Sequence, residues 1–178
     1  MDPQRQYQQR QQLQQLVEQL QIATERYQHP PLQTCAEADR LGLVRSGLRT
    51  KNLFLRSDNG KRHFLLATLS EQQVDLKALA KTLGLRRLGF ASPERLWHYL
   101  GLEPGQVSLL ALGHPAANQV EVLIDQQLWT GASVQCHPLD NCQTWCVPQQ
   151  GLVQLFDHWQ VRWQLLPVPA LSNDIRAC

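Results

Sequence analysis

Residues 50–55 read Thr50-Lys51-Asn52-Leu53-Phe54-Leu55, an apolar run with strand propensity that carries a lysine near its start. The turn residues Ser57-Asp58-Asn59-Gly60 follow, and then a second apolar run, His63-Phe64-Leu65-Leu66-Ala67. This pattern predicts a β-hairpin. Lys51 then lies at a strand start, near a cleft or rim, where its ammonium can bind an anion or a carbonyl. The alternative is a solvated edge-strand lysine that discourages aggregation.

Helices and strands are expected to alternate on both sides of this hairpin. The 178 residues favour one domain with a real core, and no internal repeat or linker divides the chain. Leucine spacing, capping residues and closing glycines predict helices at residues 4–26, 34–41, 75–83, 92–101 and 149–159. Short apolar runs between Gly, Pro, Asn and Asp predict strands of a mixed sheet at residues 87–91, 107–112, 120–124, 132–136 and 144–147. Residues 161–169 are expected to be an apolar tail broken by prolines.

The composition predicts a soluble globular protein. Hydrophobic residues make up 43% of the chain and charged residues 18%, and no apolar run approaches the roughly 20 residues that span a bilayer. The first residues, Met1-Asp2-Pro3-Gln4-Arg5, lead into glutamine-rich sequence without the apolar core of a signal peptide. A cytoplasmic protein without a membrane segment is therefore expected.

The five cysteines are expected to be free thiols. They form an odd set without a Cys-x-x-Cys pair, which is typical of a reducing compartment. Their positions are Cys35, Cys136, Cys142, Cys146 and Cys178. Three of them, Cys136, Cys142 and Cys146, lie close to His137 in the sequence. Alternation along strands places these side chains on different faces, and their spacing matches no standard zinc motif. No metal and no cofactor are predicted.

Charge is distributed unevenly along the chain, although the net charge is only +2. Residues 45–87 hold ten basic and three acidic side chains, a net charge of +7, whereas residues 88–178 have a net charge of −4. The first of these segments is able to face phosphate. The alternative is a set of ordinary solvated faces that folding intermixes.

The common enzyme motifs are absent. The chain has no Gly-x-Gly-x-x-Gly, Walker loop, Gly-x-Ser-x-Gly or His-Glu-x-x-His sequence. His137-Pro138-Leu139-Asp140-Asn141 could belong to a hydrolase with Cys136 or Ser133 as nucleophile. That reading is disfavoured, because strand neighbours such as Cys136 and His137 point in opposite directions.

Three segments together resemble a family of aminoacyl-tRNA editing proteins. The first is residues 50–55, the second extends from Val74 to Gly105, and the third is His137-Pro138-Leu139-Asp140-Asn141 with Thr144. The family includes YbaK, the insertion domain of prolyl-tRNA synthetase and the freestanding ProX proteins, and the resemblance is nearest to ProX. It covers roughly residues 28–160 in the right order, which is more specific than a single motif.

The resemblance implies an α+β fold, a single domain with a mixed, mostly antiparallel β-sheet and flanking helices. It implies an editing domain over residues 28–160, and outside the resemblance we expect a glutamine-rich helix over residues 1–27, packed on that domain, and a C-terminal tail over residues 161–178. The implied activity is hydrolysis of the ester in mischarged tRNA(Pro), alanyl-tRNA(Pro) first. Lys51 takes the role of the family's strand lysine, which positions the ester, and a substrate hydroxyl or a water completes the reaction. An aminoacyl ester is already activated, so positioning and oxyanion stabilisation suffice.

The resemblance also implies the binding residues and partners. Substrate-binding positions are Asn52, Phe54, Gly105, Ser108, Leu109, His137, Asn141 and Thr144, and tRNA-binding positions are Arg45, Arg49 and Arg56. The partners are the acceptor end of tRNA(Pro) and, as a further candidate, prolyl-tRNA synthetase, with the protein a monomer or weak dimer. The alternatives are a deacylase for cysteinyl-tRNA(Pro) or another small amino acid, and a non-catalytic adaptor that binds tRNA or the synthetase.

One loop departs from the family pattern. Residues 108–115, which end in His114-Pro115, stand where the family has a Thr-Pro-Leu-Gly-Leu type of run followed by Asn-Asp. Leu109 and Ala111 are expected to add side chains where backbone would be exposed, which gives a smaller or differently shaped amino-acid pocket. Cys142 also replaces a common threonine. These changes allow altered specificity, or binding without activity.

Overall fold

The predicted hairpin forms the centre of the structure. The computed structural model describes residues 3–31, 45–140 and 142–171. Strands β2 (Leu48–Ser57) and β3 (His63–Leu69) are antiparallel, with Thr50 opposite Leu69 and Arg56 opposite His63. Gly60 has a φ of 66°, a left-handed conformation that the turn requires and that favours glycine.

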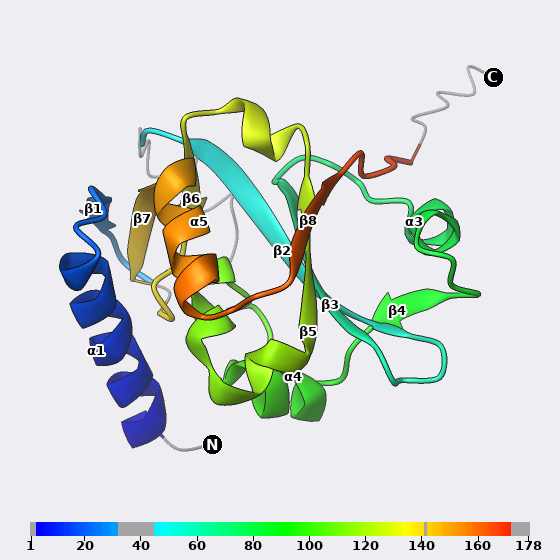
Figure 1. Cartoon of the computed structure of the whole chain (residues 1–178), viewed down its shortest axis with the longest axis horizontal. Helices are drawn as coiled ribbons and strands as arrows, with labels where there is room; N and C mark the ends of the chain where they lie inside the picture. Colours follow the sequence, from blue (N-terminus) through cyan, green and yellow to red (C-terminus); the bar gives the residue numbers. More distant parts are fainter. Residues whose placement is uncertain (1–2, 32–44, 141, 172–178) are drawn as a thin grey trace.

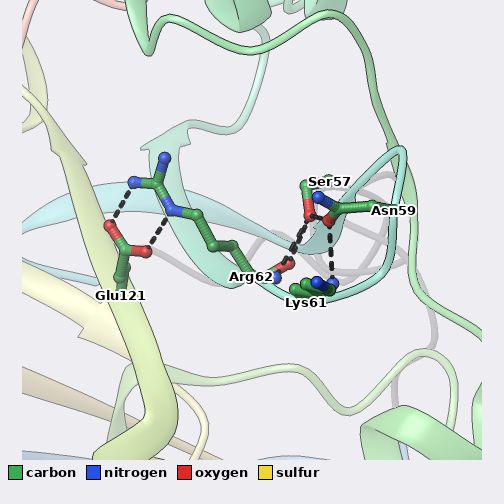
Figure 2. Close-up of polar contacts among 5 residues, drawn as sticks. All are labelled: Ser57, Asn59, Lys61, Arg62 and Glu121. Atoms are coloured by element: carbon green, nitrogen blue, oxygen red, sulfur yellow. Dashed lines mark hydrogen bonds and ion pairs between the residues drawn. The ribbon is translucent and has the colours of Figure 1, made fainter.

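Polar contacts stabilise this turn and connect the start of β3 to the strand that pairs with it on its other side (Figure 2). Ser57 Oγ donates to Asn59 Oδ1 at 2.8 Å, and Asn59 Oδ1 also accepts from the backbone N–H of Lys61 at 3.0 Å. The Arg62 guanidinium donates two hydrogen bonds of 2.7 Å to the Glu121 carboxylate on β5 (Val120–Asp125). The hydrogen bond to Glu121 raises the pKa of Arg62, so the guanidinium stays charged.

The sheet is mixed, as predicted, and has the strand order β1-β7-β6-β2-β3-β5-β8, with β4 paired to β2 (Figure 1). The other strands are β1 (Glu25–Gln28), β4 (Leu88–Phe90), β6 (Ser133–Cys136), β7 (Gln143–Pro148) and β8 (Trp163–Leu166). The pairs β2·β6, β3·β5 and β5·β8 are parallel, and the pairs β1·β7, β6·β7, β2·β3 and β2·β4 are antiparallel.

Four predicted helices are present: α1 (Pro3–Gln19), α3 (Leu76–Thr82), α4 (Pro93–Leu100) and α5 (Gln149–His158). Their capping residues act as the sequence indicates. The Asp75 side chain accepts from the N–H groups of Lys77 and Ala78, and the Ser92 side chain accepts from that of Arg95. Gly101 ends α4 in the left-handed conformation.

Three predictions about secondary structure need correction. The N-terminal helix ends at Gln19 instead of residue 26, because Glu25–Gln28 pairs with β7 as strand β1. Residues 107–112 are not a strand: Ser108 Oγ accepts from the N–H of Leu110 and starts the 3₁₀ helix η1 (Leu109–Gly113). The supposed tail contains β8, which extends the sheet by pairing with β5 (Figure 1). The helix expected at residues 34–41 lies outside the described residues.

The central strands of the sheet, β3 and β5, are buried on both faces. Alternate residues of the hairpin enter two different cores, with Phe54 and Leu65 in the larger and Leu55 and Leu66 in the smaller. Helices α4 and α5 contribute to the larger core and α3 to the smaller. Within the described residues no helix is both long and apolar enough to cross a membrane.

Candidate functional site

Strand β2 has an unpaired stretch on the edge that faces away from β3. On that edge β6 pairs with Leu48 and Arg49, and β4 pairs with residues 55–57. Between these two ladders, no strand of the described chain pairs with β2. The Phe54 carbonyl turns toward this edge, because it accepts from the Ala91 N–H at 3.0 Å. Backbone groups alternate between the two edges of a strand, so the N–H and C=O of Asn52 face the gap as well.

A cavity of about 340 Å³ lies at this gap. Its walls come from β2, from the end of β4, from α4 and from the loop that follows α4. The lining residues are Asn52, Leu53, Phe54, Phe90, Ala91, Pro93, Leu96, Pro104 and Val107. Asn52 is their only polar side chain: its Nδ2 donates to Thr50 Oγ1 at 3.4 Å, and its Oδ1 is buried without a hydrogen-bond partner. A strand edge, one amide and apolar walls suit a ligand with a flat apolar body and a polar rim.

Two of the predicted substrate-binding residues, Asn52 and Phe54, line this cavity. Sequence reasoning missed Phe90, which is 63% exposed on the cavity wall. Phe90 and the buried Leu88 are two residues apart on β4, so strand alternation predicts that both side chains lie on the same face. The sequence therefore gave no sign that Phe90 is exposed. Gly105, with a φ of 87°, occupies an exposed turn next to the lining residue Pro104.

Lys51 is half-buried and lies on the same strand, but it does not line the cavity. Because successive side chains of a strand point to opposite faces of the sheet, Lys51 points to the same face as Leu53 and Leu55, and Asn52 points to the other face. The Lys51 ammonium donates a hydrogen bond to the backbone carbonyl of Gln72, in the connection between β3 and α3. The Gln72 side chain in turn donates to the Val168 carbonyl at 2.9 Å. Among the described residues, Lys51 is thus held by one neutral acceptor, which an anionic or carbonyl oxygen of a ligand is able to replace.

Ser108 and Leu109 are fully buried in the loop that departs from the family pattern. Ser108 Oγ donates to the His137 carbonyl at 2.6 Å, so this serine connects η1 to the segment after β6. Leu109 and Ala111 belong to the larger core and are absent from the cavity wall. In this loop Leu109 and Ala111 thus pack in the larger core, and the effect of the loop on the amino-acid pocket stays a prediction.

His137 and Thr144 belong to a separate polar cluster beside β7. The hydroxyl of the buried Thr144 accepts from Arg45 Nη1 at 2.7 Å and makes a 3.0 Å hydrogen bond with His29 Nε2. His137 Nδ1 lies 3.3 Å from the Gln143 carbonyl and therefore carries the proton. Burial lowers the pKa of His137, so it is neutral at pH 7. Asn141 lies outside the described residues.

The arginines expected to bind tRNA occupy different surroundings. Arg45 contacts Thr144, as described above, and Arg49 is half-buried on β2 where β6 pairs with it. Arg56 Nη1 donates to the carbonyls of Ser57 and Asp58 at 3.1 and 3.3 Å, at the turn end of the hairpin. The three side chains do not form one cluster with the cavity.

The cysteine chemistry weighed from the sequence has no support in the structure. Cys136 and Cys146 are free thiols, as predicted, whereas Cys35 and Cys178 lie outside the described residues. Burial raises the pKa of Cys136 to about 12, so its nucleophilic thiolate is not formed at neutral pH. Over the described ranges, no group of three or more His, Cys, Asp or Glu side chains is arranged to hold a metal ion.

His63 is a buried histidine behind the cavity wall that sequence analysis did not single out. Its ring stacks on Phe54 at a centroid distance of 5.9 Å and lies 4.2 Å from Tyr99. Arg95 Nη1 donates to His63 Nε2 at 2.7 Å, so this nitrogen is unprotonated. Burial, and then the nearby charges of Arg95, Arg56 and His98, lower the pKa of His63 to about 4.

We expect His63 to make the folded protein acid-sensitive. An unfolded histidine takes up its proton near pH 6.5 and the folded His63 only near pH 4, so its contribution to stability is present above pH 6.5 and is lost as the pH falls toward 4. Between pH 7 and pH 5 this amounts to about 2 kcal/mol of unfolding free energy. In His63→Gln, which keeps an acceptor for Arg95, urea unfolding is expected to lose that part of the pH dependence. An equal pH dependence in both proteins would contradict this role of His63.

Comparisons with known proteins agree with this architecture. Residues 29–155 match the family model described as an aminoacyl-tRNA editing domain. The chain is 32% identical over 139 residues to the prolyl-tRNA editing protein ProX of Acetoanaerobium sticklandii, a match that covers 78% of this chain and 85% of that protein. It is 29% identical over 153 residues to prolyl-tRNA synthetase associated domain-containing protein 1 of Danio rerio, covering 85% of this chain and 83% of that protein.

A solved structure shares the fold. A crystal structure of a candidate trans-editing enzyme for prolyl-tRNA synthetase superimposes with a TM-score of 0.68 at 16% identity, covering 96% of this chain and 99% of that one. The family match includes both the hairpin that carries Lys51 and the gap beside it. It confirms the family and the enzyme class expected from the sequence, aminoacyl-tRNA editing. The chain belongs to the aminoacyl-tRNA editing domain family.

Proposed function

We propose that this protein is a trans-editing deacylase that hydrolyses alanyl-tRNA(Pro) released by prolyl-tRNA synthetase. The name of the relative from Acetoanaerobium sticklandii points to prolyl-tRNA, and the matched family supports an editing reaction. The observation that carries the proposal is the cavity at the open edge of β2, the strand that also presents Lys51. Because no strand covers this edge in the described residues, a ligand that enters the gap is able to reach both faces of β2.

The reaction requires little from the protein. A water, oriented by the protein or by the free hydroxyl of the ribose, attacks the ester carbonyl carbon. The bond from that carbon to the ribose oxygen breaks, the oxygen takes a proton, and free alanine leaves. Lys51 exchanges the Gln72 carbonyl for the ester oxygen, on which negative charge develops during attack. Its half-buried position strengthens this interaction relative to the same contact in water.

Release of amino acid from alanyl-, cysteinyl- and prolyl-tRNA(Pro) by the purified full chain tests the proposal. We expect alanine to be released with prolyl-tRNA(Pro) spared, because discrimination between such substrates rests on differences in fit at the site. Faster release of cysteine would move the assignment to a cysteinyl-tRNA(Pro) deacylase. Tight binding of tRNA(Pro) without release of any amino acid would replace the enzyme with an adaptor that binds tRNA.

A further inference from the structure

Helix α1 makes polar contacts with two loops that are distant from each other in the sequence. Gln6 Nε2 donates to the Gly101 carbonyl at 3.3 Å and to Gln106 Oε1 at 3.4 Å, in the loop that follows α4. Arg10 lies one turn further along the same face of α1, and its Nη1 donates to Asp140 Oδ2 at 2.7 Å, between β6 and β7. One face of α1 therefore holds both loops.

The contact between Arg10 and Asp140 holds a loop in a strained conformation. The Asp140 side chain is only 13% exposed, and its other oxygen, Oδ1, accepts from the N–H of Cys142 at 2.9 Å. The preceding residue, Leu139, is buried and has a φ of 63°, a left-handed conformation that leucine rarely adopts. Such a conformation persists only where the surrounding chain is held in place. Arg10 supplies one of the contacts that hold it.

Ser108 connects the strained loop to a wall of the cavity. Its Oγ donates to the His137 carbonyl at 2.6 Å, and Ser108 is fully buried. It directly follows Val107, which lines the cavity together with Pro104 from the same loop. The path from Arg10 to this wall thus consists of an ion pair, a strained loop and a buried hydrogen bond. A change at Arg10 is able to shift the wall without removing any atom from it.

We infer that Arg10 is a positioning residue of the editing site, which acts through Asp140 and Ser108 on the cavity wall. The inference rests on the proposed function, because the wall affects the reaction only if the cavity holds part of the substrate. Charge-assisted hydrogen bonds are short and strong, so this ion pair suits the task. Helix α1 precedes residue 29, where the family match begins, so the match itself assigns Arg10 no role.

Arg10→Gln tests the inference, because it keeps a polar side chain on the helix and removes the charge. We expect kcat/KM for alanyl-tRNA(Pro) to fall by about 10-fold, since a site displaced by about 1 Å loses up to about 100-fold in rate. The midpoint of urea unfolding is expected to stay close to that of the unmodified protein. Hydrogen exchange of the Cys142 amide, followed by NMR, is expected to become faster, because the Asp140 carboxylate that protects it loses its anchor.

Two further variants separate positioning from general support of the fold. Arg10→Lys is expected to recover most of the activity, because the contact is made by Nη1 and an ammonium is able to donate in its place. Arg10→Gln combined with Asp140→Asn should lose no more activity than Asp140→Asn alone, because both changes break the same contact. Additive losses would show that Arg10 does not act through Asp140, and would overturn the inference.

Glu18→Gln is the matched control on the same helix. Glu18 pairs with Arg26 on β1 at 3.9 Å, and its side chain is 68% exposed. An exposed pair of this kind contributes little, so kcat/KM and the exchange of the Cys142 amide should both stay unchanged. An equal loss of activity in Glu18→Gln and Arg10→Gln would overturn the inference, because any weakening of α1 would then have the same effect.

The two readouts separate this inference from the proposed function. If Arg10→Gln released alanine as fast as the unmodified protein, the deacylase would stand and Arg10 would not be a positioning residue, whatever the rate of exchange. If no protein of the set released alanine but the Cys142 amide exchanged faster in Arg10→Gln, the deacylase would be rejected. The hold of Arg10 on the loop would then stand without it.

Discussion

Lys51→Met is expected to lower kcat/KM for alanyl-tRNA(Pro) by 100-fold or more. The substitution keeps an unbranched side chain of similar length on the half-buried face of β2 and removes only the ammonium. Loss of one donor to a developing oxyanion costs about 100- to 1000-fold in rate. The loss should fall mainly on kcat, because the interaction strengthens in the transition state. Single-turnover release of labelled alanine measures it directly.

Lys61→Met is the matched control. Lys61 is an exposed lysine in the hairpin turn, and its backbone N–H, not its ammonium, binds Asn59 (Figure 2). Its turnover should stay close to that of the unmodified protein. Lys51→Arg should recover only part of the activity, because the planar guanidinium cannot reproduce the point charge of the ammonium. If Lys51→Met turned over substrate within threefold of the unmodified protein, Lys51 would have no role in stabilising the oxyanion.

The elements that were predicted correctly carry their signals locally. The hairpin follows from two apolar runs around a Gly-containing turn, and α4 follows from the cap Ser92 and the closing Gly101. The elements that were missed depend on partners distant in sequence. Residues 25–28 become a strand because β7 is beside them, and residues 163–166 because β5 is beside them. Such pairings have no local signature, so propensity alone could not reveal them.

The site was predictable only in part for the same reason. The resemblance to the editing family gave Asn52 and Phe54, which do line the cavity. The cavity itself exists because β4 and β6 pair with different ends of β2, a fact of register that the sequence does not display. Phe90 could not be recognised without that register. Thr144 was predicted as a substrate-binding residue. The sequence did not show that it is buried, because its burial depends on the pairing of β7 with β1.

The second large effect is expected in the strand that supports Lys51. Leu65 and Leu66 are adjacent on β3 and fully buried, but Leu65 belongs to the larger core and Leu66 to the smaller one. Each leucine-to-alanine change removes buried methyl groups and leaves a cavity, which costs about 3 kcal/mol of unfolding free energy. Because β3 is buried on both faces, both variants should be destabilised to a similar extent. Urea unfolding followed by tryptophan fluorescence measures the two losses.

Leu171→Ala provides the control, since Leu171 is 51% exposed and its truncation should change stability by less than about 0.5 kcal/mol. If β3 were buried on one face only, one of the two β3 variants would be as stable as Leu171→Ala. Leu66→Ala tests the smaller core most directly, because Leu66 is the residue opposite Leu53 and shares the Lys51 face of the hairpin. If Leu66→Ala lost little stability, the smaller core would not hold β2 in place. The position of Lys51 would then depend on the larger core alone.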